Sequence, residues 1–191
     1  MSLRAFSLAV LCSSTILAAP PGATPLSPPA PAKSVAPYLP ANWKAGAATL
    51  TVTPQKLLWM AGYAARKKPA EGKVQELFAK ALALEDEQGS KLVFVTLDLI
   101  GVPQLLRREV ARQAEQKYGL PPAHLVMNAS HTHSGPSLRT TPLTDADKDN
   151  PKAKDLWEYT QNLQNDLVSL IGKALSDMQP ARLTWNKARC G

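Results

Sequence analysis

The 191-residue sequence predicts an α/β fold in which helices cover a mixed β-sheet. Three observations favour this class. Short β-rich runs recur between residues 45 and 185, and a segment with clear helix start and stop signals separates two of them. A longer amphipathic helix then precedes the last run. Strand and helix therefore alternate along the chain, as they do when helices pack on a sheet that includes parallel strands.

The first 42 residues differ in composition from the rest. Residues 1–19 combine Arg4, a short apolar run and the small residues Ala18 and Ala19, which is typical of a secretory signal peptide. Residues 20–42 carry eight prolines and no apolar periodicity, which predicts an extended Pro/Ala-rich linker. We therefore expect a secreted or periplasmic protein whose folded α/β domain occupies residues 43–191.

The first half of this domain reads as strands around one long loop. Residues 45–54 alternate Leu50 and Val52 with threonines, which indicates a half-buried strand. Residues 57–72 contain two glycines and a proline without a sustained period, which predicts a loop; its apolar start argues against disorder. Residues 76–86 and 91–99 are expected to form a hairpin, with Asp98 near the end of its second strand.

The second half adds two helices and two strands. Pro103 opens a helix over residues 102–119 and Gly119 ends it. Residues 124–130 form the next predicted strand. Apolar residues at steps of three and four predict a long amphipathic helix over 153–178, and residues 181–185 are predicted to form a further strand.

The net charge of +7 is spread thinly along the chain. Its densest groups are Arg66–Lys68 and three arginines on the first predicted helix, Arg107, Arg108 and Arg112. Aromatic residues do not interleave with them, so we expect no nucleic-acid partner. A solvated basic face is the favoured interpretation, and contact with an anionic membrane surface is the second.

Two of the three histidines lie one residue apart in "NASHTHSGP" (128–136), after a strand. In an extended segment His131 and His133 would point the same way, so that both rings address one point. Imidazoles in this arrangement suit Zn²⁺, although two histidines bonding backbone groups in a turn is the other interpretation. Asp98, at the end of a neighbouring strand, is expected to be a further ligand or to orient a ring N–H.

A zinc hydrolase needs three protein ligands and an open position. His124 lies at the opposite end of its predicted strand and is a poor third ligand. The residues by themselves thus supply half of a metal centre.

The histidine segment resembles the corresponding motif of the neutral, non-lysosomal ceramidases. "AGAATLTVTP", "MAGYAARKKPAEG", "LVFVTLDLIG" and "YGLPPAHLVMNASHTHSGP" are similar to blocks of that family in the same order, over roughly residues 45 to 185. The resemblance implies zinc-dependent hydrolysis of the amide of ceramide or of a related N-acyl lipid. It implies that His131 is a metal ligand, that His133 is a catalytic residue facing the same site, and that Gly62 and Tyr63 line the substrate approach.

The chain also departs from the family pattern. Thr51–Val52–Thr53–Pro54 replaces the common aspartate–isoleucine–threonine–proline, no histidine follows the glycine of the loop, and Ser137 replaces a second glycine. The family's other ligands, a histidine, a glutamate and a tyrosine, lie further along than Gly191. We therefore expect an incomplete ceramidase-type catalytic domain, an N-terminal portion that binds zinc weakly and lacks its C-terminal part. The alternative is a non-catalytic exported module that binds lipid or a partner through its basic surface.

Overall fold

The computed structural model describes residues 42–185, 187 and 188, and over this range it confirms the α/β class. The predicted signal peptide and, apart from Asn42, the predicted linker lie outside the described residues. The elements follow in the order β1 (Trp43–Thr51), β2 (Phe78–Glu85), β3 (Lys91–Leu97), α1 (Gln104–Tyr118), η1 (Pro122–His124), β4 (Leu125–Ala129), η2 (Asp145–Asp147), α2 (Pro151–Ser176) and β5 (Gln179–Ala181). None of the described helices is long and apolar enough to cross a membrane.

The five strands form one mixed sheet in the order β4-β3-β2-β1-β5. The predicted hairpin is confirmed, since β2 and β3 pair antiparallel, and β1 pairs antiparallel with both β2 and β5. Strands β3 and β4 are parallel, and α1 is the crossover between them, because two parallel strands cannot be joined by a tight turn. This β3–α1–β4 unit brings the ends of two strands to the same edge of the sheet.

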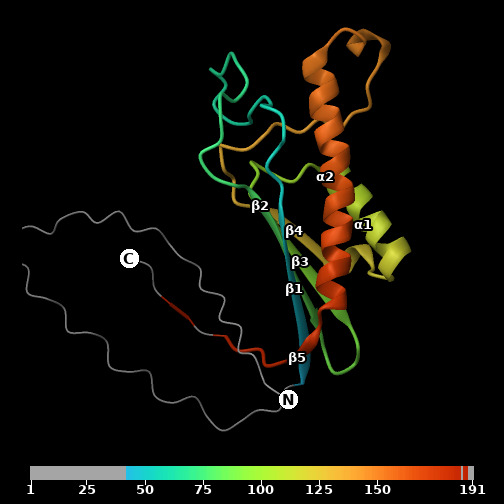
Figure 1. The fold of residues 1–191 in the computed structure, drawn as a ribbon. Coiled ribbons are helices and arrows are strands. Elements are labelled where there is room, and N and C mark those ends of the chain that lie inside the picture. Colours follow the sequence, from blue (N-terminus) through green and yellow to red (C-terminus); the bar gives the residue numbers. More distant parts are fainter. Residues whose placement is uncertain (1–41, 186, 189–191) are drawn as a thin grey trace, which may run out of the picture. The chain divides into compact units, whose positions relative to one another are not determined.

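Both helices pack on one face of the sheet (Figure 1). Alternate side chains of β2 and β3 point to that face and are fully buried, as the two-residue period of a strand requires. They meet the apolar stripe that the sequence predicts for α2. The core consists mainly of Ala79, Ala81, Ala83, Val93, Val95, Leu97, Leu106, Val110, Leu163, Leu167, Leu170 and Ile171.

Helix α2 approaches β1 very closely at Gly46. A Cβ atom at this position would lie 2.1 Å from the carbonyl oxygen of Ala174 and 2.8 Å from the backbone nitrogen of Met178. The inward positions of the neighbouring β2 are all alanine. Small residues on two adjacent strands therefore allow the long helix to lie directly on the backbone of the sheet.

The other face of the sheet carries apolar side chains that are partly buried or exposed. Ala47, Leu82, Phe94 and Val126 form one row across β1, β2, β3 and β4, with Leu84 opposite Leu92 in the next row. Both described helices lie on the opposite face. The sequence expectation that helices cover the sheet thus holds for one of its two faces.

The predicted last strand, residues 181–185, was placed too late in the sequence. Strand β5 is Gln179–Ala181, and it pairs with Trp43–Ala45 at the start of β1. The chain leaves α2 directly beside Gly46, so pairing begins at once, and Pro180 is tolerated because β5 is the edge strand. Leu183 and Trp185, which produced the strand-like pattern, are exposed (55% and 84%).

Candidate functional site

The candidate site lies where β3 and β4 end. The prediction that the strand of Asp98 and the strand before the histidines are neighbours around one helix is confirmed, because β3 and β4 pair in parallel with α1 between them. The backbone N–H of Ser130 still bonds the Leu97 carbonyl, at 2.9 Å. The chain leaves the sheet at this point, and the two histidines follow immediately.

The two histidine rings converge. Their Nε2 atoms are 3.4 Å apart, and the ring centroids are separated by 5.1 Å with the planes inclined at 66°. The Nδ1 atom of His131 lies 2.7 Å from the carbonyl oxygen of Ile100. A carbonyl can only accept, so Nδ1 carries the proton, and the Nε2 atom of neutral His131 presents its lone pair toward His133.

The reason given for this convergence in the sequence prediction was wrong. His131 is not in extended backbone; its φ is +58°, in the left-handed region that side chains rarely adopt. The rings meet because the chain turns sharply after β4, and not because side chains alternate along a strand. Non-glycine residues held in this region cluster at functional sites.

Asp98 is engaged with the neighbouring strand. Its carboxylate accepts a hydrogen bond from the Phe78 backbone at 2.9 Å, and its own N–H donates to the Phe78 carbonyl at 2.9 Å. It thus ties the end of β3 to the start of β2. The group that orients the His131 ring is the carbonyl of Ile100, two residues further along, and a backbone carbonyl leaves no signal in residue type.

The long loop after β1 packs against the histidine segment. The N–H of Ala61 donates to the Gly135 carbonyl at 2.9 Å, and the N–H of Ser137 donates to the Trp59 carbonyl at 2.7 Å. Between these bonds Met60 forms an isolated antiparallel bridge with Pro136. The predicted loop is therefore ordered by pairing with the segment that carries the histidines.

Charged contacts attach the base of the loop to α2. The ammonium group of Lys56 lies 2.8 Å from Asp155 and 2.9 Å from Glu158, and these hydrogen bonds raise the pKa of Lys56. Lys152 places its ammonium group 3.8 Å from the centroid of the Trp59 ring. Helix α2 thus holds the base of the loop through these contacts.

Gly62 and Tyr63, which the resemblance places at the substrate approach, both touch His133. Gly62 has φ +75°, and a Cβ atom there would lie 2.5 Å from Cγ of His133. The ring of Tyr63 meets the His133 ring edge-on, with centroids 4.8 Å apart and planes at 74°. Tyr63 itself has φ +45° and is largely exposed. The structure therefore brings these two residues together with both histidines.

Sequence reasoning missed Arg66, which it counted only as part of a basic group. Its Nη1 donates to the Ala61 carbonyl at 3.0 Å and its Nη2 to the His133 carbonyl at 2.8 Å. The guanidinium carbon also lies 5.1 Å from the centroid of the Tyr63 ring. Arg66 therefore links the loop to the histidine segment, a role that only the folded arrangement reveals.

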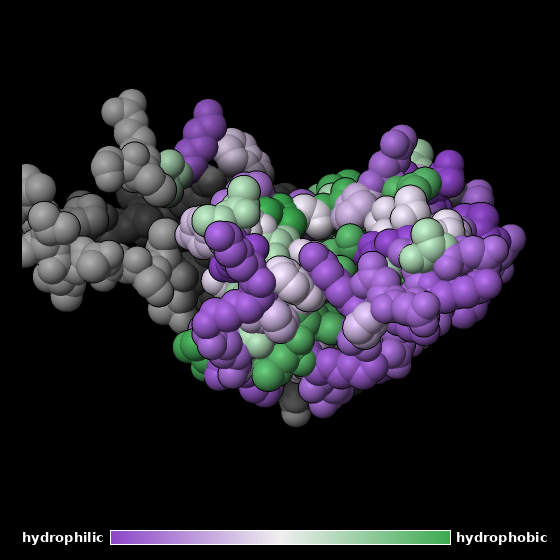
Figure 2. Space-filling model, turned by 90° about the horizontal axis from the view of Figure 1, so that it is seen from above, coloured by the Kyte–Doolittle hydropathy of each residue, from purple (hydrophilic) through white to green (hydrophobic). Residues whose placement is uncertain are grey.

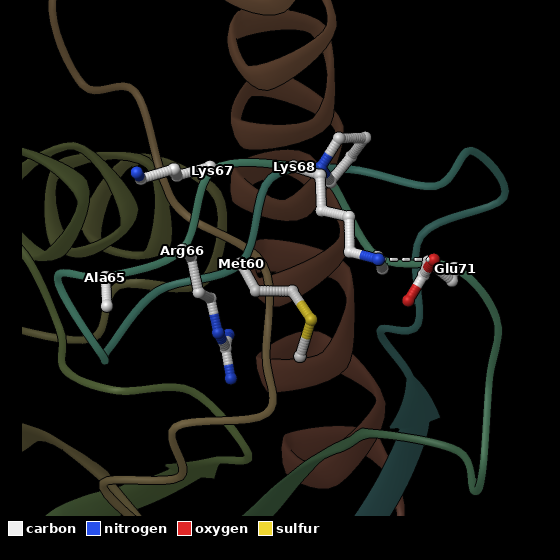
Figure 3. A pocket seen from close by; sticks show the side chains of 8 residues that line it. Met60, Ala65, Arg66, Lys67, Lys68 and Glu71 are labelled. Atoms are coloured by element: carbon white, nitrogen blue, oxygen red, sulfur yellow. Dashed lines mark hydrogen bonds and ion pairs between the residues drawn. The ribbon is translucent and has the colours of Figure 1, made fainter.

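One hollow lies beside the histidine segment, and a second is formed by the loop alone. The first, of about 370 Å³, is lined by apolar loop residues, Leu57, Leu58, Met60 and Val74 among them, together with Thr132 and Ser134. The second, of about 610 Å³, is lined by Met60, Arg66, Lys67 and Lys68, with Lys68 paired to Glu71 at 2.6 Å (Figure 3). In the space-filling view from above, hydrophobic residues are visible at the surface between hydrophilic ones (Figure 2).

The spacing of the two Nε2 atoms is one that a zinc ion can accommodate. With Zn–N distances of about 2.0–2.1 Å, a tetrahedral ion holds two nitrogens roughly 3.3–3.4 Å apart, and the Nε2 atoms are 3.4 Å apart. With the proton on Nδ1, His131 has the tautomer that a metal bound at Nε2 requires. Within the described residues no three His, Cys, Asp or Glu side chains gather as a metal site. His124 lies in η1, at the other end of β4.

Comparison with known families gives one match over most of the chain. The sequence profile described as "Neutral/alkaline non-lysosomal ceramidase, N-terminal" matches residues 43–190. The neutral ceramidases of Drosophila pseudoobscura pseudoobscura and Drosophila melanogaster are each 32% identical to this chain over 93 residues. That match covers 48% of this chain and 13% of either relative. The chain thus corresponds to a small part of these relatives' length.

Two solved structures share the fold. A structure described as "Ceramidase complexed with C2" superimposes with a TM-score of 0.57 at 24% identity, covering 75% of this chain and 22% of that one. The neutral ceramidase from Pseudomonas aeruginosa superimposes with a TM-score of 0.56 at 22% identity, covering 75% and 23%. The sheet and helices described above therefore recur inside much larger chains.

Proposed function

Because this chain belongs to the neutral/alkaline non-lysosomal ceramidase family, we propose that it supplies part of a zinc-dependent hydrolase that cleaves the amide bond of an N-acyl lipid of the ceramide type. The observation that carries the proposal is the pair of Nε2 atoms of His131 and His133, 3.4 Å apart, with the His131 ring fixed by Ile100. His131 is the metal ligand in this proposal and His133 the catalytic residue beside it.

The chemistry divides between the metal and the two rings. Zinc supplies Lewis acidity, which polarises an amide carbonyl and makes water a stronger nucleophile at neutral pH. His131 holds the metal through Nε2. His133 offers its Nε2 at the same point, where it takes a proton from the attacking water and returns it to the leaving amine. The edge of the Tyr63 ring and the backbone of Gly62 keep the His133 ring facing this point.

The substrate class rests on the hollow of about 370 Å³ beside the histidine segment, whose lining combines apolar residues with polar ones that include Lys56 and Lys73. Leu57, Met60 and Val74 offer apolar surface there, and Thr132 and Ser134 add hydroxyl groups next to the histidines. Sites for apolar ligands combine a mostly apolar lining with a few polar groups in this way. We assign this hollow to a hydrocarbon chain of the substrate, with Gly62 and Tyr63 on the approach.

The proposal requires more of the protein than the described residues. A catalytic zinc takes three protein ligands, and His131 is one of them in this proposal. We assign the other ligands to residues outside the described range, so that zinc binding by His131 alone is weak. An exported location, expected from residues 1–19, completes the proposal.

The test is hydrolysis of a fluorescent short-chain N-acylsphingosine by the zinc-loaded chain. We expect slow deacylation that His131→Ala abolishes and His124→Ala leaves unchanged, because His124 lies at the far end of β4. The His124→Ala variant is the control for the loss of an imidazole group elsewhere in the chain. Equal rates for the wild-type chain and His131→Ala would contradict the assignment of the site.

A second candidate function is a non-catalytic module that binds an anionic lipid surface. The open hollow of about 610 Å³ favours it, because Lys67 lies at that hollow together with Met60, while Lys68 is paired with Glu71 (Figure 3). Of the helix arginines, Arg107 bonds two backbone carbonyls and Arg112 pairs with Glu109, so they are already engaged. Under this alternative, binding to anionic vesicles survives removal of both histidines and falls steeply with salt.

A further inference from the structure

We propose that the sheet face away from the helices is a dimer interface, against which the same face of a second copy of this chain packs. The described helices α1 and α2 both lie on the other face (Figure 1). Apolar side chains nevertheless continue across β1 to β4 on the side that no described helix covers. This open face consists of Ala45, Leu84 and Leu92 in one row and Ala47, Leu82, Phe94 and Val126 in the next.

The strand sequences are those of a sheet that is buried on both faces. A strand with one face in water alternates apolar and polar residues, whereas a strand covered on both faces is apolar without interruption. Residues 81–84 of β2 and residues 92–95 of β3 are each four apolar residues in a row. The helices cover only every second one of these side chains, and Val126 on β4 remains 41% exposed. The open face therefore has the composition of an interface.

The open face is free of charged side chains, although the chain carries a net charge of +7. The adjoining row, toward the histidine segment, consists of Thr49, Lys80, Thr96 and Asn128. The ammonium group of Lys80 lies 5.9 Å from the centroid of the Phe78 ring, one row further from the open face. A surface that binds anionic lipid would carry several cations beside its apolar residues. Two copies of this chain, in contrast, can bring their open faces together without opposing like charges.

The size of the open face predicts a weak dimer. Strands lie about 4.8 Å apart and alternate residues about 7 Å apart, so four strands and three rows cover roughly 20 Å by 20 Å, or about 400 Å² in the plane of the sheet. Because side chains stand out from this plane, two copies would bury on the order of 1,000 Å² in total, the lower limit for a specific interface. We therefore expect association that depends on concentration.

The packing of two such faces needs no second kind of surface. Sheets pack face to face about 10 Å apart with their strands inclined by about 30°, and a two-fold axis brings the same face of each copy together. The polar row lies between the open face and the ends of β3 and β4, where the histidine segment begins. The contact thus ends before the candidate site, and the proposal does not depend on the zinc site.

The experiment is sedimentation velocity of the full chain from micromolar to nearly millimolar concentration. We expect the average mass to rise from that of one chain toward that of two. Phe94→Lys and Val126→Lys each place a charge in the interface twice, once from each copy, and are expected to raise the dimer dissociation constant at least about 10-fold. Leu143→Lys makes the same kind of change outside the sheet, at a similar exposure (38%, against 41% for Val126), and is expected to leave this constant unchanged.

Far-UV circular dichroism establishes that each variant is folded. Val126 is already partly in solvent on an edge strand, so Val126→Lys decides the question even where Phe94→Lys does not fold. A wild-type chain that stays monomeric at the highest concentration would overturn the proposal and assign the open face to a different occupant. Wild-type affinity in both lysine variants would also overturn it, because the contact between copies would then lie elsewhere.

Discussion

Replacing Gly62 with alanine is expected to abolish most of the deacylation activity while the fold stays intact. The added Cβ atom would lie 2.5 Å from Cγ of His133 and 2.7 Å from its Cβ and Nδ1 atoms. These atoms form the base of the ring, so a small rotation cannot relieve the clash. The φ of +75° adds strain for any residue with a side chain. The His133 ring must move away from the site, and because a positioned acid or base contributes about 100-fold or more to a rate, we expect the deacylation rate to fall about 100-fold.

The matched control for this substitution lies in the same loop. A Cβ atom at Gly72 would meet nothing within 4 Å, so Gly72→Ala is expected to deacylate the fluorescent N-acylsphingosine at the wild-type rate. Both zinc-loaded variants are assayed after circular dichroism has shown that they are folded. A Gly62→Ala chain with an unchanged rate would mean that the contact between this glycine and His133 has no part in the site.

Gly46→Ala is expected to cause the largest loss of stability. Its Cβ atom would lie 2.1 Å from the Ala174 carbonyl oxygen, 2.8 Å from the Met178 nitrogen and 2.9 Å from the Asp177 carbonyl carbon. All three are backbone atoms, so β1 and the end of α2 must separate. Overpacking a core typically costs 1–3 kcal/mol, and more where backbone has to move. We expect the free energy of unfolding, measured by urea titration, to fall by about 3 kcal/mol or more.

Gly101→Ala serves as the comparison for stability. A Cβ atom at Gly101 meets nothing within 4 Å, and the substitution is expected to change the free energy of unfolding by less than about 0.5 kcal/mol. If Gly46→Ala were as stable as Gly101→Ala, the close packing of α2 on β1 would not exist in solution.

Most of the fold could be predicted from the sequence because its elements have strong periodic patterns. The β2–β3 hairpin has two β-rich runs around a polar turn, and α2 has an apolar stripe over many turns. The position of strand β5 could not be predicted from the sequence. It depends on where α2 ends, and α2 ends beside β1. Its residues, Gln179–Ala181, carry no strand pattern of their own.

The site was predictable where residue type carries the chemistry. The spacing of His131 and His133 and their place after a strand pointed to one shared position, and their Nε2 atoms do converge. Sequence reasoning could not find three features of the site. They are the left-handed backbone at His131, the contact of its ring with the Ile100 carbonyl, and the hydrogen bond from Arg66 to the His133 carbonyl. Each depends on a turn or on backbone atoms, which have the same chemistry in every residue and thus leave no pattern.

The central claim is that His131 is a zinc ligand, and calorimetric titration of the full chain with Zn²⁺ tests it most directly. We expect one weak site per chain, lost in His131→Ala and retained in His124→Ala. Zinc binding of wild-type affinity in the His131→Ala chain would contradict it.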